Sequence, residues 1–231
     1  MDILTFAAVI PAVVLLVYVY RLDPVEKEPM GLLLSLLFLG MLSTIPASLL
    51  ESAGDGAVSD LATVISSRTP VPPTAVETFL LIGLVEETCK FVFLYWRTWR
   101  NANFNYVFDG IVYAVFVGLG FAIAENITYV WMFGLDTAFV RAFTAIPGHC
   151  VFAVFMGYAY GLARRARTRG HGFLSFLLLI GAIVVPVLCH GLYDYLAMTG
   201  DVGAFWMFLI AFVAVGMLAA KHASRKAQVA A

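Results

Sequence analysis

The residues with the clearest chemical potential are two adjacent glutamates, Glu86 and Glu87, within an apolar run from about Thr78 to Trp96. Lys90 follows Glu86 at the i,i+4 spacing of a helical ion pair. A charged side chain at the centre of a membrane helix costs roughly 2.5–3.5 kcal/mol to insert. Because Lys90 can neutralise only one carboxylate, the other needs a partner on another helix or a function. The pattern therefore predicts a polar site inside the membrane.

Further ionisable residues fall at a similar depth in other apolar runs. Glu86 lies about 11 residues from the outer end of its expected helix, which is roughly 16 Å at 1.5 Å per residue. Glu125, His149 and His190 lie about 8 to 10 residues from the outer ends of their own expected helices. Asp194 follows His190 at i,i+4, so its carboxylate can orient the imidazole or share a ligand role. Ionisable groups from four consecutive helices at one depth indicate one site.

Three other polar residues have supporting interpretations. Lys90 is expected to form an ion pair with Glu86 or Glu125. Asn126 adjoins Glu125 after a run of small residues, and Asp109 lies at the start of its helix, where it can cap the helix. The glycines near Asn126 are expected to serve helix packing.

Composition places the chain among membrane proteins. Of its 231 residues, 62% are hydrophobic and 13% are charged, whereas soluble domains carry about 25% charged residues. We therefore expect a single transmembrane helical domain over residues 1–231. The net charge of −1 gives no indication of a nucleic-acid partner. Cys89, Cys150 and Cys189 all lie in apolar runs, which implies neither a disulfide framework nor a Cys-x-x-Cys zinc site.

The predicted fold is all-α, with about seven transmembrane helices. Their approximate ranges are 3–20, 30–50, 75–96, 109–133, 139–163, 173–198 and 202–220. The polar site would be built from the helices over about 75–198. Residues 51–74 are expected to form an extracytoplasmic loop, with a short interfacial helix near 58–65. A kink is expected near Pro147, because proline interrupts the hydrogen bonds of a helix.

Lysine and arginine positions predict the orientation. Eleven of the 14 basic residues fall in alternate loops and at the C-terminus, while the opposite loops hold only Arg68 and Arg141. Because basic residues concentrate on the cytoplasmic side, the N-terminus is expected outside and the C-terminus in the cytoplasm.

Several motifs in this order resemble the PrsW family of bacterial intramembrane proteases. They are Glu86-Glu87-x-x-Lys90, Phe108-Asp109-Gly110-Ile111-Val112-Tyr113, Gly118-Leu119-Gly120-Phe121-Ala122-x-x-Glu125-Asn126-x-x-Tyr129, Pro147-Gly148-His149 and His190-Gly191-Leu192-x-Asp194. The resemblance covers about residues 78–196. The family is similar to the CAAX prenyl-protein endopeptidases, which typically show asparagine where this chain has Asp194.

The resemblance implies an endopeptidase of the bacterial inner (plasma) membrane that acts on single-span membrane proteins such as anti-sigma factors. Glu86 or Glu87 would take a proton from water, while His149 and His190 would stabilise the oxyanion or protonate the leaving amine. Glu125 and Asp194 complete the predicted catalytic set, and Lys90, Asn126 and Asp109 the supporting one. We favour this glutamic mechanism without a cofactor.

Two alternatives remain open. Two histidines and a carboxylate also form the ligand set of a catalytic zinc, here His149 and His190 with Glu86, Glu125 or Asp194. The second alternative is a non-enzymatic ion-coupled transporter or receptor that uses carboxylates as a proton relay. Inverted repeats, which many transporters show, are not evident in the sequence.

Overall fold

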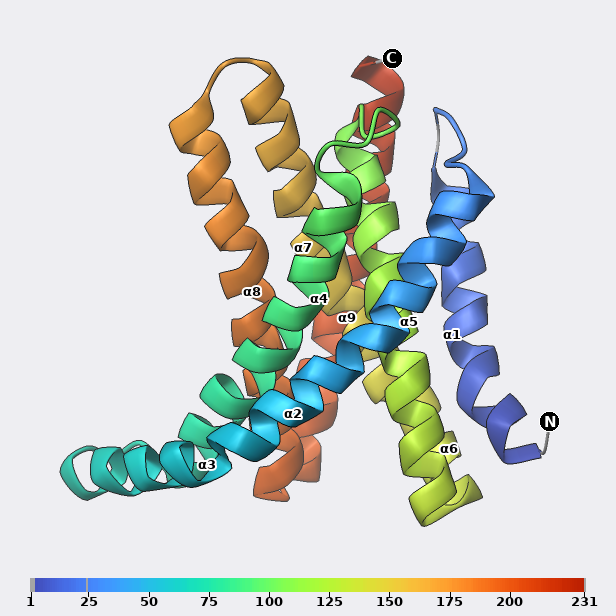
Figure 1. Ribbon diagram of the computed structural model, residues 1–231. Coiled ribbons are helices and arrows are strands. Elements are labelled where there is room, and N and C mark those ends of the chain that lie inside the picture. The colour runs from blue at the N-terminus through green and yellow to red at the C-terminus, as the bar shows by residue number, and fades with distance from the viewer. Residues whose placement is uncertain (1–2, 24, 231) are drawn as a thin grey trace.

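The computed structural model describes residues 3–23 and 25–230, with side chains described as far as Lys226. All regular structure in these ranges is helical, which confirms the predicted all-α class. The helices stand side by side in one upright bundle (Figure 1). The N-terminal and C-terminal ends of the chain lie at opposite ends of this bundle.

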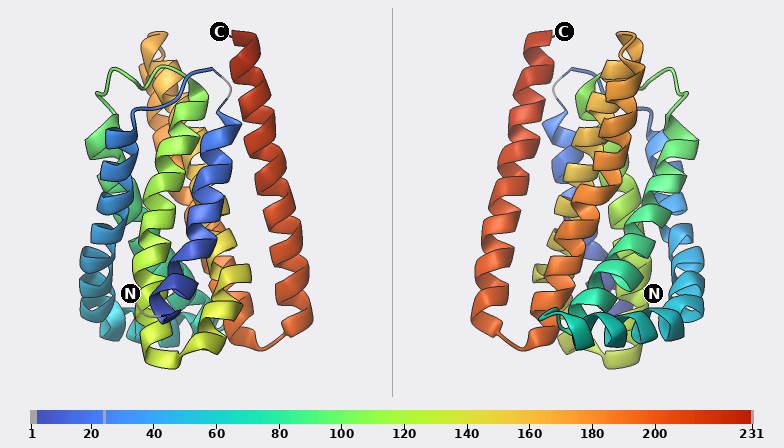
Figure 2. Two further views of the ribbon diagram at one scale, coloured as in Figure 1. Left: turned by 90° about the vertical axis from the view of Figure 1, so that its right-hand side faces the viewer. Right: turned by 90° about the vertical axis from the view of Figure 1, so that its left-hand side faces the viewer.

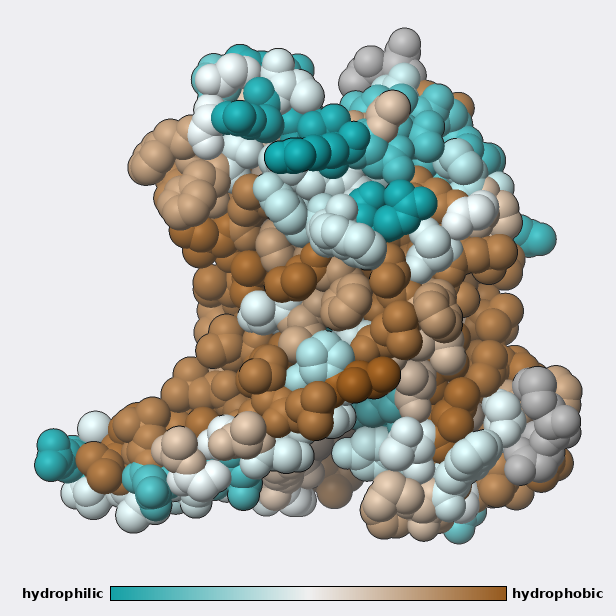
Figure 3. All heavy atoms as spheres, viewed as in Figure 1, coloured by the Kyte–Doolittle hydropathy of each residue, from teal (hydrophilic) through white to brown (hydrophobic). Residues whose placement is uncertain are grey.

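Six helical stretches in the described chain are long and apolar enough to cross a membrane. They are Ile3–Leu22 (α1), Met30–Arg68 (α2), Val107–Phe133 (α5), Leu135–Thr168 (α6, Leu135–Phe143, with α7, Ala145–Thr168), Gly172–Thr199 (α8) and Val202–Lys226 (within α9, Val202–Ala230). Figure 2 shows α9 at one edge of the bundle. On the face seen in Figure 3, hydrophobic surface covers most of the middle of the molecule, and more polar surface gathers at its two ends.

The other predicted span, about 75–96, forms a rod of three consecutive helical segments. It consists of Pro73–Val76 (α3), the π-helix Glu77–Gly83 (η1) and Leu84–Thr98 (α4). The α4 segment has 15 residues and carries charged residues of the candidate site. This rod runs from the end of α2 toward the opposite end of the bundle (Figure 1). The total of seven crossings and the orientation in the membrane stay predictions.

The structure differs from the prediction of a loop over residues 51–74. Residues 51–68 continue α2, which is one helix of 39 residues, and the predicted interfacial helix is part of it. Gly54 and Gly56 lie inside this helix, because a glycine in a helix costs only about 1 kcal/mol. Prolines 70, 72 and 73 end the helix instead. In Figure 1 the end of α2 projects from the bundle beside α3.

Helix α5 lies at the centre of the bundle and is buried along almost its whole length. Small residues allow its neighbours to approach closely. A Cβ atom on Gly110 would lie 2.6 Å from the carbonyl oxygen of Gly157 on α7, and one on Gly120 would collide with the carbonyl oxygen of Leu37 on α2. Gly118 similarly faces the side chain of Ala153 on α7. The packing role predicted for Gly118 and Gly120 is therefore confirmed.

The predicted fifth span is divided into two helices. The chain leaves helical geometry at Thr144, between α6 and α7, where φ is −118° and ψ is −76°. Pro147 lies in the first turn of α7, a position that tolerates proline because the missing N–H has no intrahelical partner there. The interruption thus precedes Pro147 rather than kinking a continuous helix. It allows α6, which carries Arg141, to pack separately against α1, α5 and α7.

Candidate active site

Four helices bring the six residues predicted to be catalytic into one cluster. Helix α4 supplies Glu86 and Glu87, α5 supplies Glu125, α7 supplies His149, and α8 supplies His190 and Asp194. One ligand atom from each of four of them, the two adjacent glutamates and the two histidines, lies within 4.8 Å of the other three. These four side chains are buried. The structure thus joins residues that the sequence placed at one depth, while their catalytic roles stay predictions.

The rod containing η1 approaches α8 closely just before the glutamate pair. A Cβ atom on Gly83 would lie 3.1 Å from the carbonyl oxygen of Val187, and one on Gly191 would lie 2.6 Å from the ring of Phe79. The seven residues of η1 form the wider turn of a π-helix, a feature common at functional sites. Because the two backbones meet here, side chains on either side of this contact can interact directly.

Lys90 lies at the centre of the cluster. Its ammonium contacts Oε1 of Glu87 at 2.7 Å and Oε2 of Glu86 at 3.0 Å. Nδ1 of His149 lies 3.3 Å from the same ammonium, and the ring of Phe121 lies 4.0 Å below it. Only 2% of the lysine is exposed. The expected pairing with Glu86 is present, and the same lysine also bridges to α7.

His190 is held between two carboxylates. Its Nδ1 lies 2.9 Å from Oε1 of Glu87, and its Nε2 lies 3.3 Å from Oδ2 of Asp194. The contact with Asp194 is a charge contact, since Oδ2 forms no hydrogen bond in the described chain. The ring of Phe152 stacks on the imidazole, with centroids 4.6 Å apart. This arrangement orients the ring, with its two nitrogens directed toward carboxylate oxygens of α4 and α8.

His149 links Lys90 to a second carboxylate. Its Nε2 lies 2.9 Å from Oε2 of Glu125. An ammonium can only donate, so Nδ1 of His149 accepts from Lys90 and its Nε2 donates to Glu125. The imidazole is therefore neutral in this arrangement. The two imidazoles are close, with His149 and His190 centroids 5.2 Å apart and their rings nearly perpendicular.

Arg141 is a residue of the cluster that sequence reasoning missed. Its Nη2 lies 2.8 Å from Oε2 of Glu125, and its Nε donates to Oδ1 of Asn126 at 2.8 Å. Its guanidinium also lies 4.1 Å from the centroid of Tyr129. From the sequence, Arg141 is expected only as a basic residue of a predicted outer loop. Its position as one of two basic residues in the predicted outer loops was the available signal.

The predictions for the two remaining supporting residues, Asn126 and Asp109, have different outcomes. Asn126 belongs to the cluster, since it accepts from Arg141 and donates from Nδ2 to the carbonyl oxygen of Ala8 at 2.8 Å. Asp109 lies 17 residues before Asn126 on the same helix, roughly 26 Å away at 1.5 Å per residue. Its Oδ2 accepts from the backbone N–H groups of Asn105 and Tyr106 at 2.9 and 2.7 Å. Asp109 therefore caps α5 and lies outside the site.

Negative charge exceeds fixed positive charge in this buried cluster. Its four carboxylates and two cations are Glu86, Glu87, Glu125 and Asp194 with Lys90 and Arg141. Buried charges need compensation because the surroundings have a low dielectric constant. Protonation of a carboxylate or of His190, or a bound cation, would reduce the excess. The cluster is therefore suited to exchanging a proton with a reactant.

The cluster fits zinc in the types of its donors. Two histidines and two glutamates offer nitrogen and oxygen ligands within 4.8 Å of one another, as a catalytic zinc site requires. However, the ammonium of Lys90 contacts donor atoms of Glu86, Glu87 and His149. Two cations cannot share that position because they repel each other. Metal binding at these residues would therefore require the lysine side chain to move.

Glu51 is a second residue that the sequence analysis did not assign to the site. It lies on α2 and is within electrostatic reach of Glu125, Lys90 and His190. Its Oε1 is buried and has no hydrogen-bond partner in the described chain. Because a loop was expected to begin at residue 51, the proximity of Glu51 to the cluster could not be predicted. An unpaired carboxylate beside the site adds to the local negative charge.

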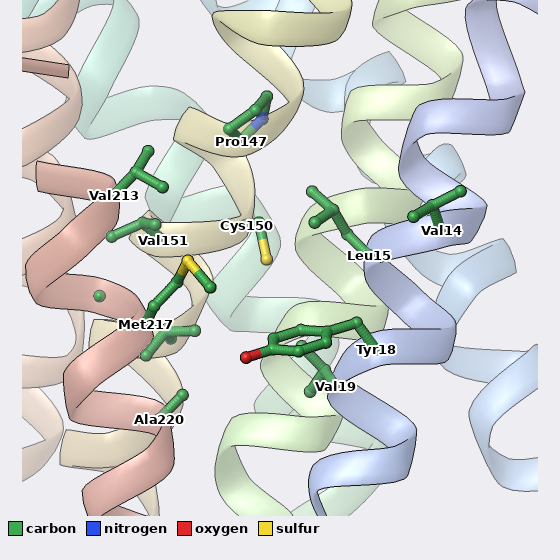
Figure 4. A pocket seen from close by; sticks show the side chains of 12 residues that line it. Val14, Leu15, Tyr18, Val19, Pro147, Cys150, Val151, Val213, Met217 and Ala220 are labelled. Carbon is green, nitrogen blue, oxygen red and sulfur yellow. The ribbon is translucent and has the colours of Figure 1, made fainter. Parts of the chain in front are cut away.

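Cys150 faces away from the site although it adjoins His149. It lines an apolar cavity of about 240 Å³ between α1, α7 and α9, together with Tyr18, Val151 and Met217 (Figure 4). Adjacent residues on a helix point about 100° apart, which explains the separation. Cys150 therefore contributes to apolar packing rather than to the cluster.

Sequence comparisons place the chain among known proteases. A sequence model of the family described as PrsW family intramembrane metalloprotease matches residues 28–219. A curated relative named Protease PrsW, from Geobacillus kaustophilus (strain HTA426), is 33% identical over 205 residues, covering 88% of this chain and 83% of the relative. Protease PrsW of Bacillus subtilis (strain 168) is 32% identical over 190 residues, covering 82% and 80%. No solved structure matches the chain.

The apolar helices define a multi-pass membrane protein, and its helices enclose a buried carboxylate–histidine cluster. The chain belongs to the PrsW family of intramembrane proteases. This confirms the resemblance found in the sequence motifs. It also favours the protease prediction over the transporter or receptor alternative. The family description as metalloprotease keeps the zinc alternative open.

Proposed function

We propose that this protein cleaves single-span membrane proteins inside the bilayer, with Glu86 activating the attacking water. One observation carries the proposal. Oε2 of Glu86 binds Lys90, whereas Oε1 forms no hydrogen bond in the described chain, and 9% of the side chain is exposed. A general base needs a free oxygen within hydrogen-bonding reach of the water proton. Glu86 offers such an oxygen within the cluster.

Glu87 is better suited to organising the site than to acting as the base. Its Oε1 contacts both Lys90 at 2.7 Å and His190 at 2.9 Å, and only 1% of the side chain is exposed. A carboxylate with two such partners is less available to take a proton from water. Glu87 instead fixes the lysine of its own helix and the histidine of α8. Glu86 and Glu87 thus divide the roles of base and anchor.

His190 supports the second half of the reaction. Hydrolysis needs a proton for the leaving amine and a positive group near the developing oxyanion. The imidazole between Glu87 and Asp194 is oriented to hold a proton for this purpose. Asp194 then acts on the histidine as a carboxylate rather than as a neutral oxyanion donor.

His149 and Arg141 form a second group around Glu125. Both contact the same oxygen, Oε2 of Glu125, at 2.9 and 2.8 Å. A substrate carbonyl oxygen beside this group would meet the guanidinium of Arg141, which has further N–H groups to donate. The arrangement supports a role in binding the scissile peptide and stabilising its oxyanion.

A zinc-dependent mechanism at the same residues is the second candidate. It is favoured by the family description and by the donor set of Glu86, Glu87, His149 and His190, which would hold the ion. When bound, zinc would supply Lewis-acid polarisation of water and of the substrate carbonyl. In that case Lys90 would leave the donor atoms that it now contacts.

The substrate class and the location follow from the site's position and from the family. The cluster is enclosed by helices with a hydrophobic surface, so a substrate segment has to enter from the bilayer (Figure 3). A single-span protein, such as a membrane-anchored anti-sigma factor, would meet this requirement. We assign the protein to the bacterial inner membrane on the same grounds.

Cleavage of single-span peptides by the purified protein in liposomes tests the proposal. Glu86→Gln should lower the single-turnover rate by at least about 100-fold, in line with the usual contribution of a general base. Glu77→Gln serves as the matched control, because Glu77 lies in η1 on the same rod but outside the cluster. Its rate should stay near that of the wild type. A folded Glu86→Gln variant with the wild-type rate would contradict the proposal.

A further inference from the structure

A second cavity lies at the end of the bundle where α7 and α8 are joined. Its volume is about 1090 Å³. Its walls come from residues 102–107, the C-terminal half of α7, the start of α8 and the end of α9. The surface at this end of the molecule is hydrophilic (Figure 3). The cavity is separate from the candidate active site, because none of the clustered glutamates or histidines lines it.

The cavity carries positive charge without a matching acid. Its cationic lining residues are Arg164, Arg165, Arg169 and Lys226. No carboxylate is among its lining residues, and none of these four forms an ion pair in the described part of the chain. Four like charges around one cavity repel each other, so an anionic ligand would be stabilised there.

Arg164 is partly anchored, whereas Arg165 and Arg169 are free to bind a ligand. Nε of Arg164 donates to the carbonyl oxygen of Phe104 at 3.3 Å, and its guanidinium lies 5.8 Å from the ring of Trp99. Arg165 and Arg169 are exposed, and no side-chain hydrogen bond holds either of them. Both are therefore available to contact an anion. Guanidinium groups suit phosphate in particular, because they can donate two parallel hydrogen bonds.

Apolar residues extend the cavity toward the lipid-facing surface. Leu162 of α7 and Leu174 and Leu178 of α8 line it. Next to them on α8, Phe173 and Leu177 are exposed large hydrophobic residues. The cavity therefore offers cationic groups at one end and an apolar path at the other. A free anion would use only the first of these features.

We propose that this cavity binds an anionic phospholipid. The phosphate lies against Arg165 and Arg169, and an acyl chain follows Leu174 and Leu178 along α8. The positive-inside rule accounts for arginines at this end of the chain. It does not require them to surround a cavity that lacks acids. Basic pockets between transmembrane helices are known to accept lipid head groups.

Lipid retention by the full-length protein tests this site. The protein would be reconstituted in vesicles of equal parts phosphatidylglycerol and phosphatidylcholine, extracted gently and examined by native mass spectrometry. The wild type should retain phosphatidylglycerol in preference to phosphatidylcholine. Arg165→Gln with Arg169→Gln should lower that retention by about tenfold. Arg100→Gln with Lys221→Gln removes two basic residues from outside the cavity and should leave it unchanged.

Three results would overturn the proposal. Equal losses in the two double variants would show that diffuse surface charge holds the lipid. Equal retention of the two lipids by the wild type would exclude a site for anionic lipid. Displacement of phosphatidylglycerol by inorganic phosphate at about 10 mM would indicate a phosphate site without a role for the apolar wall. If the glutamine pair does not fold, Arg165→Lys with Arg169→Lys, which keeps the charge, should retain the lipid, and its loss would also contradict the proposal.

Discussion

The ammonium of Lys90 lies 3.3 Å from Nδ1 of His149, although the two residues are 59 positions apart in the chain. This contact joins α4 to α7 and determines which nitrogen of His149 is free to donate. The same ammonium holds Glu86 and Glu87. A single buried lysine therefore organises the base, its neighbour and one histidine.

Replacing Lys90 with methionine should destabilise the protein strongly. The change leaves two buried carboxylates without their cation, and breaking a buried ion pair costs about 3–5 kcal/mol. Adding Glu87→Gln should restore part of the stability, because it removes one of the unpaired charges. Thermal unfolding in detergent measures both effects, with the exposed Lys221→Met as control. Equal unfolding temperatures for Lys90→Met and the control would show that the pair contributes nothing.

Arg141→Gln should lower cleavage about tenfold to a hundredfold, because a hydrogen bond to a charged group contributes about 1.5–3 kcal/mol. The loss should appear in kcat if Arg141 and Glu125 act on the transition state, rather than in KM alone. Arg68→Gln is the control, since Arg68 lies at the end of α2 and has no ion pair in the described chain. An unchanged kcat for Arg141→Gln would restrict the arginine to a structural role.

Glu28, between α1 and α2, should make stability depend on pH. Its Oε2 accepts from the hydroxyl of Tyr113 at 2.6 Å, while its Oε1 is buried and has no hydrogen-bond partner among the described residues. Burial raises the pKa of Glu28 to about 7 from its ordinary value of 4.5; the bond from Tyr113 opposes the rise, and the charge of Asp23 adds to it. Between these values the folded chain keeps a proton that the unfolded chain releases. Stability should therefore fall as pH rises through this window.

The variant Glu28→Gln tests this dependence, because glutamine keeps an acceptor for Tyr113 but cannot ionise. Its unfolding temperature should change less than that of the wild type between about pH 5 and pH 8. Asp55→Asn, at an exposed position on α2 whose charge does not act on Glu28, should retain the wild-type profile. Identical profiles for Glu28→Gln and the wild type would assign the pH dependence to other groups.

The orientation in the membrane can be read from thiol labelling. In a background lacking the three native cysteines, a cysteine at position 60 should react with an impermeant reagent added outside. A cysteine at position 168 should not react, because it lies at the basic end. Both positions are exposed, so burial does not prevent labelling. The reverse pattern would invert the predicted topology.

Much of the site could be predicted because membrane helices have a regular rise. Counting residues from the helix ends placed Glu86, Glu125, His149 and His190 at one depth, and the structure brings these residues together. The i,i+4 pairs, Glu86 with Lys90 and His190 with Asp194, followed from helical periodicity. These relationships follow from helix geometry and from the distance of each residue to the end of its apolar run. Both can be read from the sequence.

The rest depends on packing between helices, which spacing along the chain does not reveal. Arg141 reaches Glu125 because the chain breaks at Thr144 and α6 packs separately. Glu51 comes near the cluster because α2 continues through two glycines. The contact of Lys90 with His149 requires a particular rotation of α4 against α7. Such tertiary contacts override the local signals on which sequence reasoning relies.

The most direct test of the central claim is to measure cleavage and metal content on the same chelator-treated sample. Protein without stoichiometric metal should still cleave a single-span peptide, because Lys90 contacts the donor atoms of Glu86, Glu87 and His149 and Glu86 activates the water. Glu86→Gln, treated identically, should be inactive. Loss of cleavage on chelation, with recovery upon binding roughly one zinc per chain, would contradict the account and establish the metal-dependent mechanism.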